Sequence, residues 1–181
     1  MITNNFTTMK KTLYSFIALF AAIALASCSK DPIGGTATQE YAGEWYVTCD
    51  AVDENDNVIP GYEDLFGLGR FNIVTYNSSA NNTNELMVCD LGMFWDFRVK
   101  TALNPANYTF SAVDAQDYID PDCLVDIEGA IYKNAGRQNN GSVADSICIY
   151  VSFSNDQYPD EYGYSRYKLS GVRYSGLVEN D

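Results

Sequence analysis

The chain has 181 residues, with 24 acidic and 11 basic side chains, a net charge of −13 and no histidine. Such an acidic surface repels phosphate backbones, so nucleic acid is not an expected partner. The absence of histidine removes Ser-His and Cys-His dyads, imidazole metal ligands and the usual general base near neutral pH. The length fits one domain around a single core.

The N-terminus has the pattern of an export signal. A basic pair at 10–11 precedes a largely apolar run at 13–26, shorter than the roughly 20 residues that span a bilayer. The run ends in Leu-Ala-Ser before Cys28, which resembles the bacterial lipobox and implies cleavage before an acylated Cys28. We expect a lipoprotein signal peptide at 1–27 and an outer-membrane anchor at Cys28, with the protein on the periplasmic or cell-surface face. The alternative is an ordinary secretory signal followed by a chance cysteine.

The mature chain divides into a tether and one domain. Residues 28–40 are mostly small and polar, which predicts a flexible tether, and 41–181 form the expected domain. Turn-forming Asn, Asp, Gly and Pro clusters separate the strand-like segments of this domain. These segments are 44–52, 69–77, 85–90, 93–101, 107–113, 123–132, 145–154 and 164–176.

Apolar and polar residues alternate along several of these segments. Ile147, Ile149 and Val151 share one face of segment 145–154, and Trp95 and Phe97 share one face of segment 93–101. Period-two alternation with one apolar face indicates an antiparallel sheet that is buried on one side. Eight such segments with mostly short connections predict an all-β fold, a single antiparallel up-and-down eight-stranded barrel. A two-sheet sandwich is the alternative, and the best helix candidate is a short turn near 62–66.

The cysteines leave the redox state open. An exported chain can form disulfides, but each downstream cysteine lies in or beside an apolar strand-like run, which also suits buried free thiols. These residues are Cys49, Cys89, Cys123 and Cys148. Zinc is not expected without histidine or paired thiolates, and the acidic segment 53–57 lacks the glycine that a calcium loop needs. We therefore expect no metal and no cofactor.

The chain is rich in aromatic residues, with 14 Tyr, nine Phe and two Trp. These rings could fill the barrel themselves or line a cavity for an apolar ligand. In the second case the ligand enters opposite Trp45, and the connection 53–68 acts as a lid with Leu65 and Phe66 beneath it. The candidate ligand-binding residues face inward in the predicted strands: Trp45, Phe71, Ile73, Trp95, Phe97, Ile149 and Val151.

Gly43-Glu44-Trp45 resembles the G-x-W motif of the calycins, the lipocalin-like barrels. In that group the tryptophan closes one end, and a basic residue on the last strand covers it, a role for which Arg173 is placed. The chain from about residue 41 more specifically resembles the lipid-binding putative-hydrolase lipoproteins of Bacteroidetes-type bacteria. The segments that carry this resemblance are 42–47, 74–77, 90–100, 109–112, 144–147 and 169–176. It implies a calycin-like barrel and lipid binding, but supplies no catalytic residues.

The sequence thus predicts a monomeric outer-membrane lipoprotein that binds a small apolar or lipid-like ligand in a barrel cavity. The alternatives are a carboxylate-dependent hydrolase and a non-enzymatic cell-surface adaptor for protein or glycan. The lack of histidine and of a recognisable nucleophile argues against an enzyme. An open apolar cavity would favour the first hypothesis, and paired carboxylates in a cleft the second. A filled barrel with an aromatic patch on its loops would favour the third.

Overall fold

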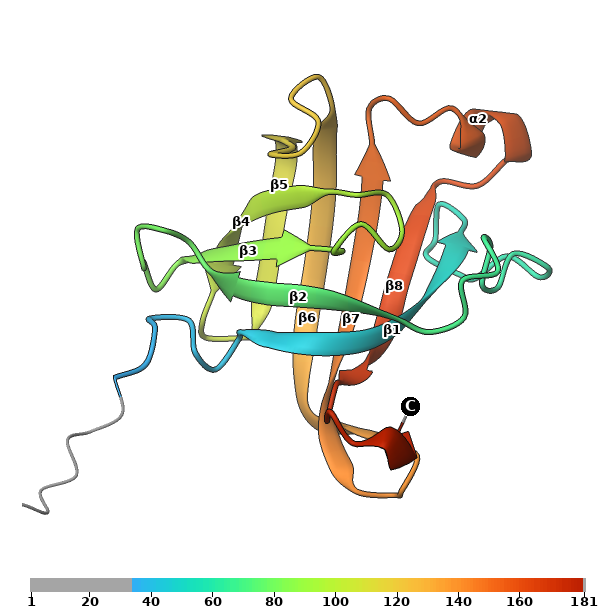
Figure 1. Cartoon of the computed structure of the whole chain (residues 1–181). Helices are drawn as coiled ribbons and strands as arrows, with labels where there is room; N and C mark the ends of the chain where they lie inside the picture. The colour runs from blue at the N-terminus through green and yellow to red at the C-terminus, as the bar shows by residue number, and fades with distance from the viewer. Residues whose placement is uncertain (1–33, 181) are drawn as a thin grey trace, which may run out of the picture. The chain divides into compact units, whose positions relative to one another are not determined.

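The computed structural model describes residues 34–180, and its strands follow one another in chain order around a closed antiparallel barrel (Figure 1). Residues from Thr36 onward form one compact unit. The predicted signal peptide, Cys28 and most of the tether lie outside the described residues. The strands are β1 (Gly43–Val52), β2 (Phe71–Asn77), β3 (Glu85–Cys89), β4 (Arg98–Asn104), β5 (Thr109–Gln116), β6 (Leu124–Arg137), β7 (Val143–Phe153) and β8 (Arg166–Arg173). This arrangement confirms the predicted all-β up-and-down barrel.

Alternating burial explains why these segments form a barrel. In β7 the side chains of Ile147, Ile149 and Val151 are buried, whereas those between them are only partly covered. Closure depends on β1 and β8, which pair from Trp45 opposite Arg173 to Val52 opposite Arg166. A side chain at Gly171 would collide with the backbone of Tyr46, so glycine permits this close strand approach.

The fourth strand differs from its prediction, because it begins at Arg98 and not at residue 93. Leu91, Gly92 and Asp96 adopt positive φ angles, which are incompatible with an extended strand. Trp95 therefore lies in the connection between β3 and β4 rather than on a strand. A second difference is the five-residue helix α2 (Tyr158–Tyr162) between β7 and β8, which the sequence pattern did not predict. A short 3₁₀ turn, η1 (Val178–Asn180), follows β8.

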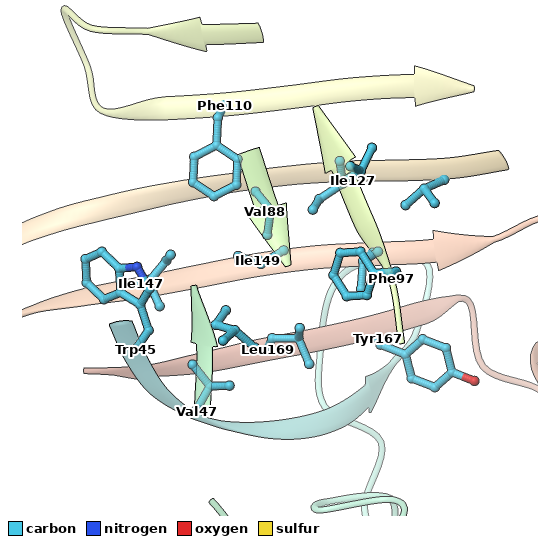
Figure 2. Packing of buried hydrophobic residues seen from close by; sticks show 14 of the residues in the cluster. Trp45, Val47, Val88, Phe97, Phe110, Ile127, Ile147, Ile149, Tyr167 and Leu169 are labelled. Carbon is cyan, nitrogen blue, oxygen red and sulfur yellow. The ribbon is translucent and has the colours of Figure 1, made fainter. Parts of the chain in front are cut away.

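Because the strands alternate in direction, alternate connections gather at opposite ends of the barrel. The β2–β3, β4–β5 and β6–β7 connections lie at the end that contains Trp45. The other connections, 53–70, 90–97, 117–123 and 154–165, lie at the end that we call the mouth. Figure 2 shows the core between them, with Trp45 at one side of the view and Phe97 and Tyr167 at the other.

All four cysteines within the described residues carry free thiols. Cys49, Cys89 and Cys123 are buried, and Cys148 is half-buried. Burial raises the pKa of Cys148, so its sulfur is a neutral thiol and a weak nucleophile. Among the residues that the structure describes, no helix has both the length and the hydrophobicity needed to cross a membrane.

Candidate ligand site at the barrel mouth

The end opposite the mouth is closed by Trp45 and the groups around it. The indole is fully buried, and its Nε1–H donates to Thr75 Oγ1 at 2.9 Å. The Thr75 hydroxyl in turn donates to the carbonyl oxygen of Tyr41 at 2.6 Å. Arg173 lies with its guanidinium carbon 4.4 Å from the centroid of the Trp45 ring, and its Nη1 donates to the Ala42 carbonyl at 2.7 Å. The last strand and the segment before β1 are thus joined across the tryptophan.

Arg173 also forms an ion pair with Asp145, with 3.4 Å between Nε and Oδ2. Partial burial alone would raise the pKa of Asp145. Hydrogen bonds from Lys133 and the Asn134 N–H, together with the positive charges of Lys133 and Arg173, instead hold this pKa below its usual value. Asp145 is therefore ionised at neutral pH, and Arg173 is fixed between a carboxylate and an aromatic face.

Replacing Arg173 by alanine is expected to lower the free energy of unfolding by about 1–2 kcal/mol, the size of a partly desolvated cation–π contact. Urea unfolding followed by circular dichroism measures this change. Arg137→Ala is the matched control, because it removes the same charge from an exposed arginine at the same end. An Arg173→Ala protein as stable as the Arg137→Ala protein would show that the contact contributes nothing.

The interior between the two ends is filled. Six predicted ligand-binding residues lie in the core with at most 2 % of their surface exposed: Trp45, Phe71, Ile73, Phe97, Ile149 and Val151. A cavity large enough for a water molecule would leave accessible area on the side chains around it. The barrel cavity expected from the sequence is therefore occupied by the chain's own side chains, as eight strands permit. Trp95, the seventh residue, is only partly buried and lies at the mouth.

Aromatic rings gather at the mouth. Phe94 lies among them, with its ring centroid 5.0 Å from that of Tyr167 and 5.7 Å from that of Phe66. Trp95 stacks on Phe153 at 4.8 Å with only 10° between the ring planes. We call the linked rings the mouth cluster: Phe66, Phe94, Trp95, Phe153, Tyr158 and Tyr167. Because Phe66 and Tyr158 are 38 % and 45 % exposed, the cluster joins the core to solvent.

A buried carboxylate organises the connection that carries Phe94 and Trp95. Asp90 has no exposed surface, and its two oxygens accept five backbone N–H groups at 2.7–3.1 Å. The donors are residues 92, 94, 95, 96 and 97. This cage of donors stabilises the buried charge and bends the chain around it. Asp90 thus holds the backbone that positions the side chains of Phe94 and Trp95.

A second buried carboxylate connects two mouth segments. Asp117 is 2 % exposed, and its Oδ1 accepts the backbone N–H groups of Arg98 and Ile119, both at 2.9 Å. It therefore ties the β5–β6 connection to the start of β4, directly after the Asp90 loop. Since both buried carboxylates bind backbone donors, they have structural roles, and their arrangement gives no support to a carboxylate-dependent hydrolase.

The β1–β2 connection folds over the first strand beside the mouth. The Leu65 N–H donates to the carbonyl of Cys49, and the Asp64 N–H donates to the Asp50 carboxylate. These bonds hold Leu65 against the core and leave Phe66 partly exposed above Tyr167. Arg166 anchors the far part of the connection through Asp56, at 2.8 Å.

The phenol of Tyr167 takes part in a buried hydrogen-bond chain under the mouth cluster. It donates to Asp156 Oδ2 at 2.6 Å and lies 2.8 Å from the hydroxyl of Tyr164. Burial raises the pKa of Tyr164 to about 12 and raises that of Tyr167 as well, so both phenols are protonated at neutral pH. The chain joins β8 to the β7–β8 connection and keeps the Tyr167 ring facing the cluster.

A separate groove of about 520 Å³ lies on the outer surface of β4 to β7. Tyr132, Tyr150, Glu128 and Asn104 contribute to its lining, together with small residues and the half-buried Cys148. Its floor includes Leu103 and Phe110 of the core, and none of its lining residues is among the predicted ligand-binding residues. Its lining mixes polar and apolar side chains, whereas the mouth presents a set of linked aromatic rings.

The closed antiparallel barrel with an aromatic mouth fits the class of ligand-binding β-barrels. The profile of the family described as lipid-binding putative hydrolase matches residues 30–178. The chain therefore belongs to this family, as its resemblance predicted. No curated protein matches the chain significantly.

Proposed function

We propose that the protein binds the apolar chain of a lipid-like ligand against the mouth cluster. The observation that carries this proposal is the partly exposed aromatic surface at one end of a filled barrel. Exposed apolar patches of this kind mark ligand or partner sites, and membership of a lipid-binding family favours a lipid. A filled barrel with an aromatic patch on its loops also suits a surface adaptor for protein or glycan, but the family match favours a lipid over those partners. The filled interior moves the proposed site from the barrel cavity to its mouth. A short acyl chain there would lie beside Phe66, Trp95 and Tyr158.

Trp95 offers a direct test, because the chain has only two tryptophans and the other one is at the opposite end. In a Trp45→Phe background, dodecyl maltoside added below its critical micelle concentration should change Trp95 fluorescence saturably. Phe66→Ser should raise the Kd about tenfold, since losing a buried phenyl contact costs roughly 1.5 kcal/mol. Phe66 is partly exposed, so this variant retains the packed core.

Tyr132→Ser is the matched control, because it removes an exposed aromatic side chain from the outer groove. It should leave the Kd unchanged. Binding that is lost in Tyr132→Ser and retained in Phe66→Ser would place the ligand in the outer groove. If dodecyl maltoside does not bind saturably to the Trp45→Phe protein without further substitution, the proposal is wrong.

The proposed setting of this activity is the outer membrane, with the domain held by lipid on Cys28. The lipobox-like segment before Cys28 and the polar tether after it support this location. In cells grown with radiolabelled palmitate, the intact protein should carry label and sediment with membranes. Cys28→Ser should lose the label, whereas Cys148→Ser should retain it. Label that persists in Cys28→Ser would contradict the anchor.

A further inference from the structure

Charge is distributed very unevenly between the two ends of the barrel. The mouth connections carry thirteen Asp and Glu residues: five in 53–70, two in 90–97, three in 117–123 and three in 154–165. Arg70 is the one basic residue among them. The connections 78–84, 105–108 and 138–142 at the opposite end contain no charged residue. The mouth is therefore the source of a strong negative potential.

Most of this negative charge faces solvent. Asp90 and Asp117 are buried with backbone donors, and Asp56 is paired with Arg166. The exposed carboxylates include Asp120 and Asp122 beside β6, and Asp160 and Glu161 on α2. Within the described part of the chain, none of these four is in an ion pair. Their field is thus available to a ligand at the mouth.

The acidic and aromatic surfaces meet at α2. This helix places Asp160 and Glu161 between Tyr158 and Tyr162, whose side chains are 45 % and 50 % exposed. The nearby carboxylate of Glu161 raises the pKa of Tyr162, which reflects the local negative potential. Among the described residues, no lysine or arginine lies over a ring of the mouth cluster. The ring faces and the carboxylates both attract a positive group.

We infer that the mouth selects amphiphiles whose head group is cationic, such as a quaternary ammonium, over neutral and anionic ones. This inference rests on the proposed function, because the apolar chain of the amphiphile occupies the mouth cluster. The head group then lies at the rim, where carboxylates and ring faces replace part of its hydration. An anionic amphiphile with an apolar chain of the same length would place its head group beside charges of the same sign.

The test compares three ligands with twelve-carbon chains: dodecyltrimethylammonium, dodecyl maltoside and laurate, each below its critical micelle concentration. Trp95 fluorescence in the Trp45→Phe background measures each Kd at low ionic strength. The ammonium ligand should bind at least about tenfold more tightly than the maltoside, and laurate should bind most weakly. In 0.5 M NaCl the three values should converge, since salt screens exposed charges.

Two double substitutions test whether the carboxylates at the mouth cause the preference for the ammonium ligand. Asp160→Asn combined with Glu161→Gln should reduce the preference for the ammonium ligand several-fold. Glu40→Gln combined with Glu179→Gln changes the net charge equally at the opposite end and should leave the preference unchanged. If the maltoside binds saturably and the ammonium ligand binds no better, the inference is wrong and the proposed function stands. If none of the three binds saturably, the proposed function itself fails.

Discussion

Replacing Trp45 by alanine is expected to lower the free energy of unfolding by about 3–5 kcal/mol, the largest stability loss among the predicted single substitutions. The indole is wholly buried at the closed end, so its removal leaves a large cavity. It also removes the hydrogen bond to Thr75 and the ring beneath Arg173. Since Trp45 pairs with Arg173 across the β1–β8 junction, the substitution destabilises the two strands that close the barrel.

Urea unfolding measured by circular dichroism tests this expectation. Trp45→Phe is the control, because phenylalanine keeps one aromatic ring and loses the N–H donor and the second ring of the indole, at a cost of about 1–2 kcal/mol. The difference between the two variants measures what the retained phenyl ring contributes. Equal stability of the alanine and phenylalanine variants would show that the closed end tolerates the cavity.

Replacing Asp90 by asparagine is expected to cost about 3 kcal/mol and to disorder the 90–97 connection. Five N–H groups converge on this carboxylate, and hydrogen bonds to a charged group contribute about 1.5–3 kcal/mol each without being additive. The asparagine amide removes the charge and directs its own donors at some of these N–H groups. Phe94 and Trp95 should then lose their fixed positions, and ligand binding at the mouth should weaken at least about tenfold.

Asp96→Asn makes the same chemical change on an exposed side chain of the same connection and is the matched control. Its stability should stay within about 0.5 kcal/mol of the unsubstituted protein. Hydrogen exchange of the amides at 92–97 should accelerate in Asp90→Asn and remain slow in Asp96→Asn. Similar exchange in the two variants would show that Asp90 does not hold the connection.

The mouth could be predicted only in part, because its geometry depends on groups that sequence periodicity does not register. Trp95 and Phe97 alternate as strand residues do, which led to the prediction of a strand over 93–101. Four N–H groups that would belong to such a strand, those of residues 94–97, instead bind Asp90. The available signal was an aspartate directly before Leu91-Gly92, since a carboxylate often caps the amides of the turn that follows it.

The sequence by itself determined the barrel, because period-two alternation leaves each strand one apolar face and closure leaves no edge strand. It also indicated the pairing of Arg173 with Trp45, since first and last strands are neighbours in a closed barrel. Only the tertiary structure decided that the interior is filled, because side-chain volumes from eight strands combine there without a pattern along the chain. It likewise assembled the mouth cluster from the ends of strands and three separate connections. These residues are far apart in the chain, and they meet because alternating strand directions bring their connections to the same end of the barrel.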